Sequence, residues 1–360
     1  MGPLKQRFAA SRRKTPVRLF GQRLAPAGAL DARPDHEQAD VRWIRKALQN
    51  SQQLPSGGWY VVDQSSAIDG TPRAYWIAGQ RWILWRSAGQ LHAAAEACPH
   101  MGASLHGAET CDGRVVCPWH GLQLGPGSRG FRTLPTYDDG LLCWVQLVRG
   151  EDERTSSPVI TTRPTAALAA VVRTEARCEP RDVIQNRLDP WHGAHFHPHS
   201  FATLRVLEQG ESEITVRVAY RVLGPYAVEV DARFHCPDPR TIVMTIVQGE
   251  GKGSVVETHA TPMQPGQTAI IEATLATSER RGFALARGLS PALRPVMRWA
   301  AARLWREDAD YAERIYALRK GALAQNGQPR LAVVTNGQPA AAPVNLQASG
   351  RGLPCSPIDS

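Results

Sequence analysis

Two short segments, CPHMG at residues 98–102 and CPWHG at residues 117–121, decide how the first half of this 360-residue chain is interpreted. Each segment offers one thiolate and one imidazole, and sixteen residues lie between His100 and Cys117. Such an excursion of the chain is long enough to bring the two segments together around a metal. Two Cys and two His suit tetrahedral zinc, or an iron–sulfur cluster in which neutral imidazoles hold one iron. The glycine that ends each segment favours a tight turn with backbone amides directed at sulfur.

Short β-strands are expected on both sides of these segments, which predicts a small β-rich domain that extends to about Leu147. The clearest of them, each bounded by Gly, Asp or Ser turns, are Trp59–Val62, Ala74–Ile77, Trp82–Trp85 and Leu91–Ala94. A short helix is expected before them at residues 38–52, and the polar segment GEDERTSSP at residues 150–158 is typical of a linker.

The two segments resemble the Rieske domain, in which C-x-H is followed by C-x-x-H, and the resemblance extends over roughly residues 55–147. It implies a [2Fe–2S] cluster with Cys98 and Cys117 on one iron and His100 and His120 on the other. Zinc becomes the weaker alternative, because the complete paired pattern in a β-rich context is much more specific than a single C-x-H.

One departure from the pattern indicates the kind of Rieske protein. Respiratory and photosynthetic members carry two further cysteines that form a disulfide beside the cluster. The corresponding positions in this chain are Ala103 and Trp119, so that disulfide cannot form. The departure favours the oxygenase or ferredoxin type over the cytochrome-complex type.

A second domain is expected after the linker, with an antiparallel sheet and helices on one side, which is the α+β arrangement. Its predicted strands are Glu213–Leu223, Ala227–Phe234, Thr241–Gln248, Ser254–Met263 and Thr268–Thr277. Two helical stretches at about 280–302 and 305–323 are expected to close it. The complete prediction is a basic tail at 1–37, the first domain at 38–150, a linker at 151–164, the second domain at 165–323 and a tail at 324–360.

The second domain contains the segment NRLDPWHGAHFH at residues 186–197, which fits N-x-x-D-x-x-H-x-x-x-x-H. Asp189 and His192 are three residues apart and would share a helix face. His192 and His197 converge if the helix ends between them. Two His and one carboxylate on one face of an octahedron leave three positions open, and ferrous iron that activates dioxygen needs those positions.

The third ligand is expected to come from another part of the chain. Asp308, in the segment WREDADYAE at residues 305–313, is the best candidate, while Glu307 and Asp310 point some 100° to 200° away around the helix. His195 is the alternative imidazole if the local helix differs from the one expected. A solvated loop or an adventitious metal binder is the competing interpretation of this His-rich segment.

This second segment resembles the catalytic domain of Rieske non-haem iron oxygenases, most of all the branch that contains chlorophyll-catabolite oxygenases. The resemblance covers about residues 38–322 and implies a helix-grip (START-like) sheet around a long helix, with a mononuclear Fe(II). It also implies a head-to-tail homotrimer in which Asp189 bridges His192 of one subunit and His120 of the next, with Asn186 in support. A helix N-cap or a local ion pair is the competing role for Asp189.

Net charge and hydropathy restrict the partners. Residues 1–23 hold seven of the 42 Lys and Arg and no acid, which leaves 35 basic and 33 acidic residues in the remainder of the chain. A general nucleic-acid footprint is therefore not expected. The basic N-terminus is either a solvated tail or a contact for an anionic membrane surface or an acidic redox partner. No membrane-spanning run or secretory signal is expected, which places the protein in the cytoplasm.

An O₂-dependent oxygenase of the hydroxylase or demethylase type is the leading functional hypothesis, acting as a monooxygenase or dioxygenase on a hydrophobic ring-containing or isoprenoid substrate. A Rieske electron carrier and a ligand-binding protein with a vestigial cluster are the alternatives. The string GPGSRG at residues 125–130 matches G-x-G-x-x-G but lies in the predicted β-rich domain, where no helix is expected after it to complete a nucleotide-binding unit, so a separate ferredoxin or NAD(P)H-dependent reductase is implied. The pocket is expected to be lined by Tyr220, Tyr226, Phe234, Met244 and the helix at 283–304.

Overall fold

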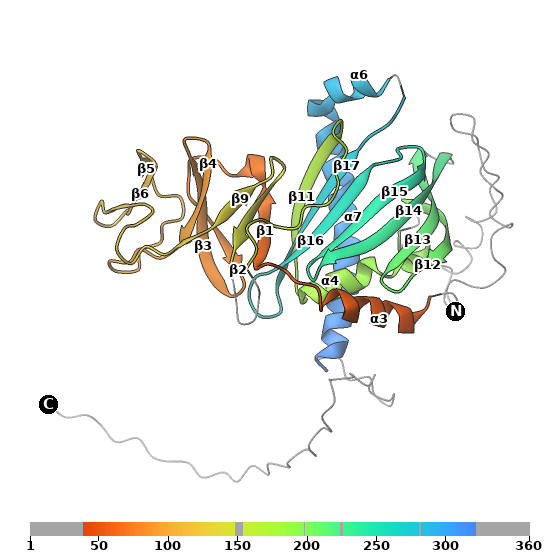
Figure 1. Cartoon of the computed structure of the whole chain (residues 1–360), viewed down its shortest axis with the longest axis horizontal. Coiled ribbons are helices and arrows are strands. Elements are labelled where there is room, and N and C mark those ends of the chain that lie inside the picture. The colour runs from red at the N-terminus through yellow and green to blue at the C-terminus, as the bar shows by residue number, and fades with distance from the viewer. Residues whose placement is uncertain (1–38, 148–153, 198, 224–225, 281, 322–360) are drawn as a thin grey trace, which may run out of the picture.

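The computed structural model describes residues 39–147, 154–197, 199–223, 226–280 and 282–321, which form two β-sheet units side by side (Figure 1). The predicted tails and the first residues of the predicted linker lie outside these ranges. Among the described helices, none has the length and apolar composition that a bilayer span requires.

The N-terminal unit is built from three small antiparallel sheets, as the sequence predicts. Their strand orders are β1-β10-β9, β2-β3-β4-β8 and β5-β6-β7. The bounds are β1 Trp59–Gln64, β2 Arg73–Ile77, β3 Gln80–Ser87, β4 Gln90–Ala95, β5 Thr110–Cys111, β6 Arg114–Val116, β7 Gln123–Leu124, β8 Thr133–Leu134, β9 Thr136–Asp138 and β10 Leu142–Gln146, with a single 3₁₀ turn at Ser65–Ala67.

Strand β3 is buried on both faces and separates two cores. Its alternating side chains send Trp82 and Leu84 into the core against β1 and β10, and Ile83 and Trp85 into the core beneath Cys98 and Cys117. The loops that carry the four predicted cluster ligands therefore rest on a close-packed apolar base.

The C-terminal unit is one antiparallel sheet of seven strands in the order β11-β17-β16-β15-β14-β13-β12. The strands are β11 Leu168–Ala176, β12 Phe201–Gln209, β13 Glu213–Leu223, β14 Tyr226–Asp238, β15 Thr241–Gly249, β16 Val255–Pro262 and β17 Thr268–Ala276. The five predicted strands are confirmed, and β11 and β12 are additional. With the long helix across one face, the sheet has the expected helix-grip arrangement (Figure 1).

The helices of this unit are α4 Pro180–Arg187, α5 Gly193–Phe196, α6 Phe283–Gly288 and α7 Ser290–Arg319, with a 3₁₀ turn at Pro190–His192. The expected break near residue 303 is wrong, because α7 is continuous over 30 residues. The chain instead breaks at Leu289, and Pro291 occupies the first turn of α7, where its missing N–H costs no hydrogen bond within the helix.

The first described helix, α3 (Val41–Ser51), begins at Asp40, whose carboxylate accepts hydrogen bonds from the backbone of Arg42 and Trp43. The sequence predicts that this helix belongs to the first domain, but in the structure its apolar face packs on the seven-stranded sheet. Trp43 belongs to the core that contains Ile214 and Val230, and its indole N–H donates to the carbonyl of Gly210 at 2.6 Å.

The two units share a core and a polar junction. Trp59 and Trp144 of the first unit pack with Val243 and Ile271 of the second. The Arg163 guanidinium lies 3.1 Å from the Asp139 carboxylate of the first unit and 2.7 Å from the Glu257 carboxylate of β16. The junction therefore fixes the orientation of one unit against the other.

Candidate active site

The loops β4–β5 and β6–β7 hold the predicted cluster ligands in matched conformations. In each loop the Cys amide donates to the carbonyl five residues ahead, at 2.8 Å for Cys98 and 2.9 Å for Cys117, and the Gly amide donates back to the Cys carbonyl. Gly102 and Gly121 have φ of 77° and 69°, a conformation that few other residues adopt without strain. Both turns are as the sequence predicts.

The thiol groups and the imidazoles of this centre differ in exposure. Cys98 and Cys117 are buried next to each other, whereas His100 and His120 are exposed with ring centroids 4.8 Å apart. Burial raises the pKa of the Cys117 thiol, but hydrogen bonds from the backbone of Trp119 and His120 outweigh it and hold that pKa below its ordinary value. Two buried sulfurs with amides directed at them, beneath two outward imidazoles, fit an iron–sulfur cluster better than a closed zinc site.

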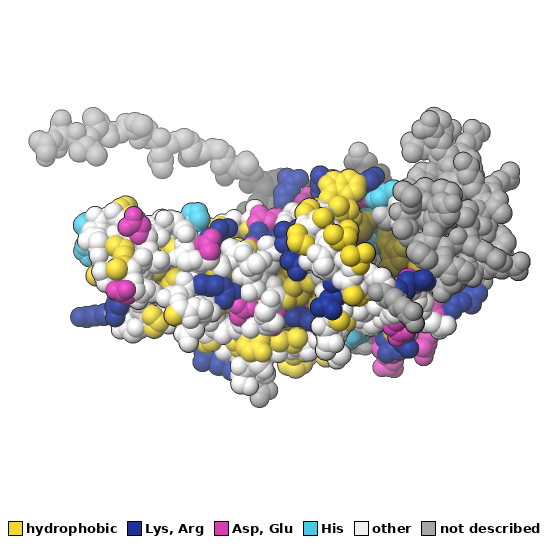
Figure 2. Space-filling view, turned by 90° about the horizontal axis from the view of Figure 1, so that it is seen from above, with side chains coloured by type: hydrophobic (Ala, Val, Ile, Leu, Met, Phe, Trp, Pro, Cys, Tyr) yellow, Lys and Arg dark blue, Asp and Glu magenta, His cyan; other side chains and the backbone are white. Residues whose placement is uncertain are grey.

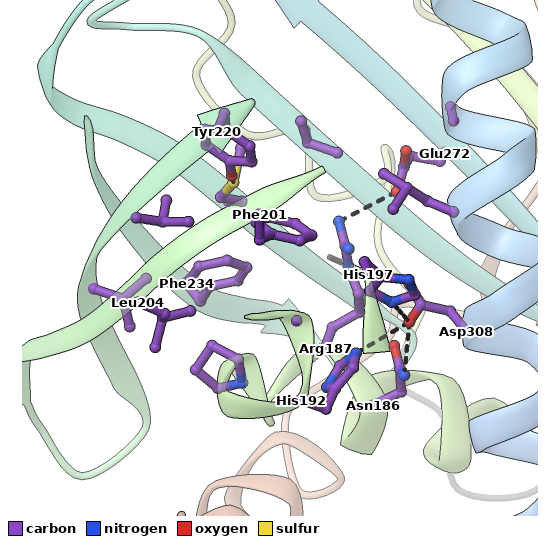
Figure 3. A pocket seen from close by; sticks show the side chains of 18 of the residues that line it. Asn186, Arg187, His192, His197, Phe201, Leu204, Tyr220, Phe234, Glu272 and Asp308 are labelled. Carbon is purple, nitrogen blue, oxygen red and sulfur yellow. Dashed lines mark hydrogen bonds and ion pairs between the residues drawn. The ribbon is translucent and has the colours of Figure 1, made fainter. Parts of the chain in front are cut away.

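The second set of ligands converges on one carboxylate oxygen. Asp308 Oδ1 lies 3.1 Å from His192 Nε2 and 2.8 Å from His197 Nε2 (Figure 3). Among the described residues these three form the one cluster of His, Cys, Asp or Glu whose ligand atoms all lie within 4.8 Å of one another. The donors match the two-His, one-carboxylate set that ferrous iron requires.

Local backbone structure explains why the two His converge. Helix α4 ends at Arg187, Pro190 starts a 3₁₀ turn, and α5 ends at Phe196, so His192 and His197 lie on separate short turns. This agrees with the prediction that the two His converge if the helix ends between them. Burial favours the neutral acid at Asp308, but hydrogen bonds from both imidazoles hold the pKa of its carboxyl well below the ordinary value.

Glu307 lies outside the candidate ligand set but contacts one of its members. Its Oε2 lies 2.5 Å from His197 Nδ1, on the side of the ring opposite Asp308. A carboxylate in this place fixes the tautomer and orientation of a ligating imidazole. The alternative ligands do not join the set: Asp310 and His195 are both exposed and lie outside the cluster.

Asn186 and Asp189 lie beside the same site. Asn186 Nδ2 donates to Asp308 Oδ1 at 3.1 Å, which agrees with a supporting role. Asp189 stands at the N-cap of the 3₁₀ turn, but its side chain makes no capping bond. Its main-chain carbonyl contacts His192 Nδ1, and its carboxylate lies 3.9 Å from the same nitrogen.

Tyr311 is a member of the site that the sequence analysis does not identify. Its hydroxyl donates to Asp189 Oδ2 at 3.0 Å, and its ring stacks on His192 with centroids 5.1 Å apart. Asp189 Oδ1 is buried and has no partner among the described residues. The signal is present in the sequence, because Tyr311 follows Asp308 by three residues and so shares its helix face.

A cavity of about 330 Å³ opens beside this set of ligands. Its wall is mainly apolar, and Figure 3 shows Phe201, Phe234 and Leu204 across the cavity from Asp308. The predicted lining residues Tyr220, Phe234 and Met244 are confirmed, together with four residues of α7: Met297, Ala300, Ala301 and Leu304. The side chain of Tyr226 is not among those that the structure describes.

The charged residues of the cavity are paired. Arg187 lies 3.2 Å from the Glu272 carboxylate, which also accepts a hydrogen bond of 2.8 Å from the Trp305 indole. Besides this pair, the acids at the described wall are Asp308, which belongs to the ligand cluster, and Asp189, whose carboxylate accepts a hydrogen bond from Tyr311.

The two candidate metal centres of one chain lie far from each other. The loops β4–β5 and β6–β7 lie at the outer end of the N-terminal unit, whereas α4 and α7 cross the C-terminal unit (Figure 1). The two sets of ligands therefore lie in different units of the chain.

Family comparisons divide the chain at the same place as the fold. Residues 58–139 match the Rieske [2Fe-2S] domain, and residues 149–323 match a domain of unknown function, DUF5914.

Two curated relatives align with about half of the chain. The vanillate O-demethylase oxygenase subunit of Pseudomonas sp. (strain HR199 / DSM 7063) is 26% identical over 196 residues, 48% of this chain and 55% of the relative. The chloroplastic chlorophyllide a oxygenase of Chlamydomonas reinhardtii is 24% identical over 191 residues, 48% of this chain and 30% of the relative. The matched region thus spans about half or less of the length of these proteins.

Solved structures share the whole architecture. Dicamba monooxygenase bound to dicamba superposes with a TM-score of 0.58 at 19% identity, over 77% of this chain and 92% of that one. The terminal oxygenase of carbazole 1,9a-dioxygenase from Novosphingobium sp. KA1 superposes with a TM-score of 0.51 at 14% identity, over 79% of this chain and 90% of that one. A Rieske unit joined to a helix-grip unit with a second ligand cluster defines a class of two-centre iron proteins. The chain contains a Rieske [2Fe-2S] domain and shares the two-unit fold of these oxygenases, and its second set of ligands, His192, His197 and Asp308, is suited to a mononuclear iron.

Proposed function

We propose that the protein is an O₂-dependent oxygenase of the hydroxylase or demethylase type. The observation that carries this proposal is the buried His192, His197 and Asp308 cluster at the wall of an apolar cavity. An electron carrier needs neither an open three-ligand site nor a cavity beside it. A pocket that only binds a ligand has no need for two complete sets of metal ligands.

Each group of residues has a separate task in this proposal. Cys98, Cys117, His100 and His120 hold the cluster, and His192, His197 and Asp308 hold the mononuclear iron. When bound, the iron supplies dioxygen activation and the cluster supplies the electrons for it.

The chain's own hydrogen bonds set the protonation of the two iron-ligating imidazoles. His197 donates its Nδ1 proton to Glu307, and His192 donates its Nδ1 proton to the Asp189 carbonyl. In this tautomer both Nε2 atoms would be available to coordinate iron beside Asp308, in place of the hydrogen bonds that they make to its Oδ1.

The cavity supports a hydrophobic, uncharged substrate. Among the described residues of its wall, Arg187 is the one Lys or Arg and is already paired with Glu272, so this wall offers no free positive group to a substrate carboxylate. Ring side chains, Phe201, Phe234 and Tyr220, form much of the wall. These features favour a neutral ring-containing or isoprenoid molecule over a small aromatic acid.

Electron supply in this proposal involves other proteins and other copies of the chain. Asp189 bridges His192 of one subunit and His120 of the next in a head-to-tail homotrimer, and its unpartnered Oδ1 is suitable for that second bond. A ferredoxin or an NAD(P)H-dependent reductase in the cytoplasm reduces the cluster; one solved relative, carbazole 1,9a-dioxygenase, forms a complex with ferredoxin.

Turnover under ¹⁸O₂ tests the proposal. The iron-loaded protein, a surrogate ferredoxin and reductase with NADH, and a panel of neutral ring and isoprenoid compounds should yield a product that carries ¹⁸O. Small aromatic carboxylates serve as the matched comparison and should react poorly. Reduction of the cluster without label in any product, and without uptake of O₂, would support the electron carrier instead.

A further inference from the structure

The turn around α6 and the first half of α7 exposes large apolar side chains in one place. Leu285, Leu289, Val296 and Trp299 are 70%, 53%, 62% and 59% exposed. Single exposed apolar residues are ordinary, but four within fifteen residues form a patch that calls for a partner. Figure 2 shows hydrophobic side chains gathered over α6 and the start of α7, with Arg and Lys side chains beside them. We call these four residues the apolar patch.

This segment is the part of α7 that the fold does not bury. Helix α6 has no buried residue, and those of α7 are Trp305, Asp308 and Ala312 in its second half. The first half of α7 contacts the cavity on one side through Met297, Ala300 and Ala301, which leaves the side that carries Val296 and Trp299 facing outward.

All the charged side chains of the same segment are positively charged. Residues 280–306 contain seven Arg and no Lys, Asp or Glu. Arg280 is paired with Glu250, and Arg303 lies over the ring of Trp299. Arg287 and Arg294 are exposed and form no ion pair with any described residue. A basic helical segment with Leu and Trp on one face is typical of peripheral binding to an anionic bilayer.

We propose that the apolar patch and its arginines dock the protein on the surface of an anionic lipid bilayer. A second copy of the chain fits less well, because a symmetric contact of this face with itself would bring two arginine-rich segments together. A lipid surface instead offers a hydrocarbon boundary for Leu285 and Trp299 and phosphate groups for Arg287 and Arg294.

The docking site lies at the cavity. Trp299 precedes Asp308 by nine residues, which is about 14 Å along a helix axis. Hydrophobic molecules partition into bilayers, so a protein docked through this face takes its substrate from the lipid phase. Uptake of the substrate from the lipid phase rests on the proposed function, whereas the docking itself does not.

Vesicle flotation of the full-length protein tests the docking, without turnover. Vesicles of phosphatidylcholine alone are compared with vesicles that contain about 30 mol% phosphatidylglycerol. Wild type should float with the anionic vesicles, and Leu285→Ser/Trp299→Ser should lower its partition coefficient by about tenfold or more. Arg287→Gln/Arg294→Gln should lower binding severalfold, and Val159→Ser/Leu207→Ser, exposed apolar residues on other elements, should float as wild type does.

Three outcomes would overturn the proposal. If wild-type protein stays at the bottom of the gradient and does not float with the anionic vesicles, the proposed docking surface does not exist. Patch variants that float as wild type does would place the contact elsewhere, for example in the basic residues 1–23. Sedimentation velocity that shows loss of subunits in Leu285→Ser/Trp299→Ser would make the patch a subunit interface. None of these results depends on oxygenase activity, so a failure of the proposed reaction is recognised separately.

Discussion

At the scale of single residues, His197 shows how this site is organised. Its ring lies between two carboxylates from adjacent positions of one helix, Glu307 on Nδ1 and Asp308 on Nε2. Adjacent helical residues point about 100° apart, so one turn of α7 reaches both edges of the imidazole. The pair of acids therefore assigns one nitrogen to hydrogen bonding and the other to metal.

Loss of the ligand carboxylate should remove one iron and leave the cluster. Asp308→Ala takes away the anionic donor that both imidazoles face, so the protein is expected to fall from about three irons to about two, with acid-labile sulfide unchanged at about two. Metal analysis together with the EPR signal of the reduced cluster measures this. Asp310→Ala, an exposed acid on the same helix, is the control, and a normal iron content in Asp308→Ala would assign the ligand to another carboxylate.

Weakening the support of His197 should give a graded effect. Glu307→Gln keeps the size of the side chain but removes its charge, so the imidazole becomes less basic and less firmly oriented. We expect the affinity for ferrous iron to fall by about 10- to 100-fold. Iron titration of the apo-site measures the change, and an affinity equal to that of wild type would show that the 2.5 Å contact has no part in binding.

The sequence indicates the ligands more readily than their supports. His192, His197 and Asp308 are identified from spacing, because donors on a short helical segment and on a helix face leave a periodic trace. Glu307 leaves no such trace, and the i+3 spacing of Tyr311 from Asp308 is no different from that of an ordinary helix face. Their roles depend on which side of the imidazole each reaches, and only the packing of α7 against α4 settles that.

At the scale of elements, alternation in the sequence identifies strands that have one polar face and misses others. Strands β13 and β14 alternate clearly and β15 to β17 are rich in β-branched residues, whereas β11 is interrupted by small Ala residues and β12 directly follows the His-rich segment. The local sequence pattern also does not predict where α3 packs. Its apolar face is evident in the sequence, but the sheet that receives it lies about 160 residues away in the chain.

The junction between the two units should be sensitive to acid. Arg163, His259 and Thr161 hydrogen-bond to the Glu257 carboxylate; burial opposes its ionisation, but these partners lower its pKa to about 2. The ionised form thus stabilises the native state above the unfolded pKa of about 4.3, and this contribution is lost as the pH falls from there towards 2.

Glu257→Gln should therefore destabilise the protein by about 3 kcal/mol at pH 7, with the difference from wild type shrinking below about pH 4.5. Urea unfolding followed by circular dichroism at several pH values measures it. Glu175→Gln, whose exposed carboxylate pairs with Arg173, should change stability by less than about 1 kcal/mol. A pH-independent difference between Glu257→Gln and wild type would contradict this assignment.

At the scale of the whole molecule, the proposed head-to-tail homotrimer makes activity a property of neighbouring subunits. Cys98→Ser should disable a subunit as electron donor, whereas Asp308→Ala should disable it as acceptor. If donor and acceptor are adjacent subunits, co-expression of the two inactive variants should restore about a quarter of wild-type turnover, because half of the acceptors are intact and half of those face an intact donor.

Asp189→Ala provides the matched control for this experiment. It lies on the acceptor side of the proposed bridge, so it should restore activity when combined with Cys98→Ser and fail to do so with Asp308→Ala. Activity in the second pair, or none in the first, would show that electrons do not pass between subunits through Asp189.

Helix α7 links three of these features in one rigid element. Val296 and Trp299 of the apolar patch lie in its first half next to the cavity wall, Glu307, Asp308 and Tyr311 come next, and Arg319 anchors its end to Asp182 at 2.7 Å. Because these residues lie on one continuous helix, we expect a displacement of its exposed first half to change the position of the Asp308 carboxylate relative to His192 and His197.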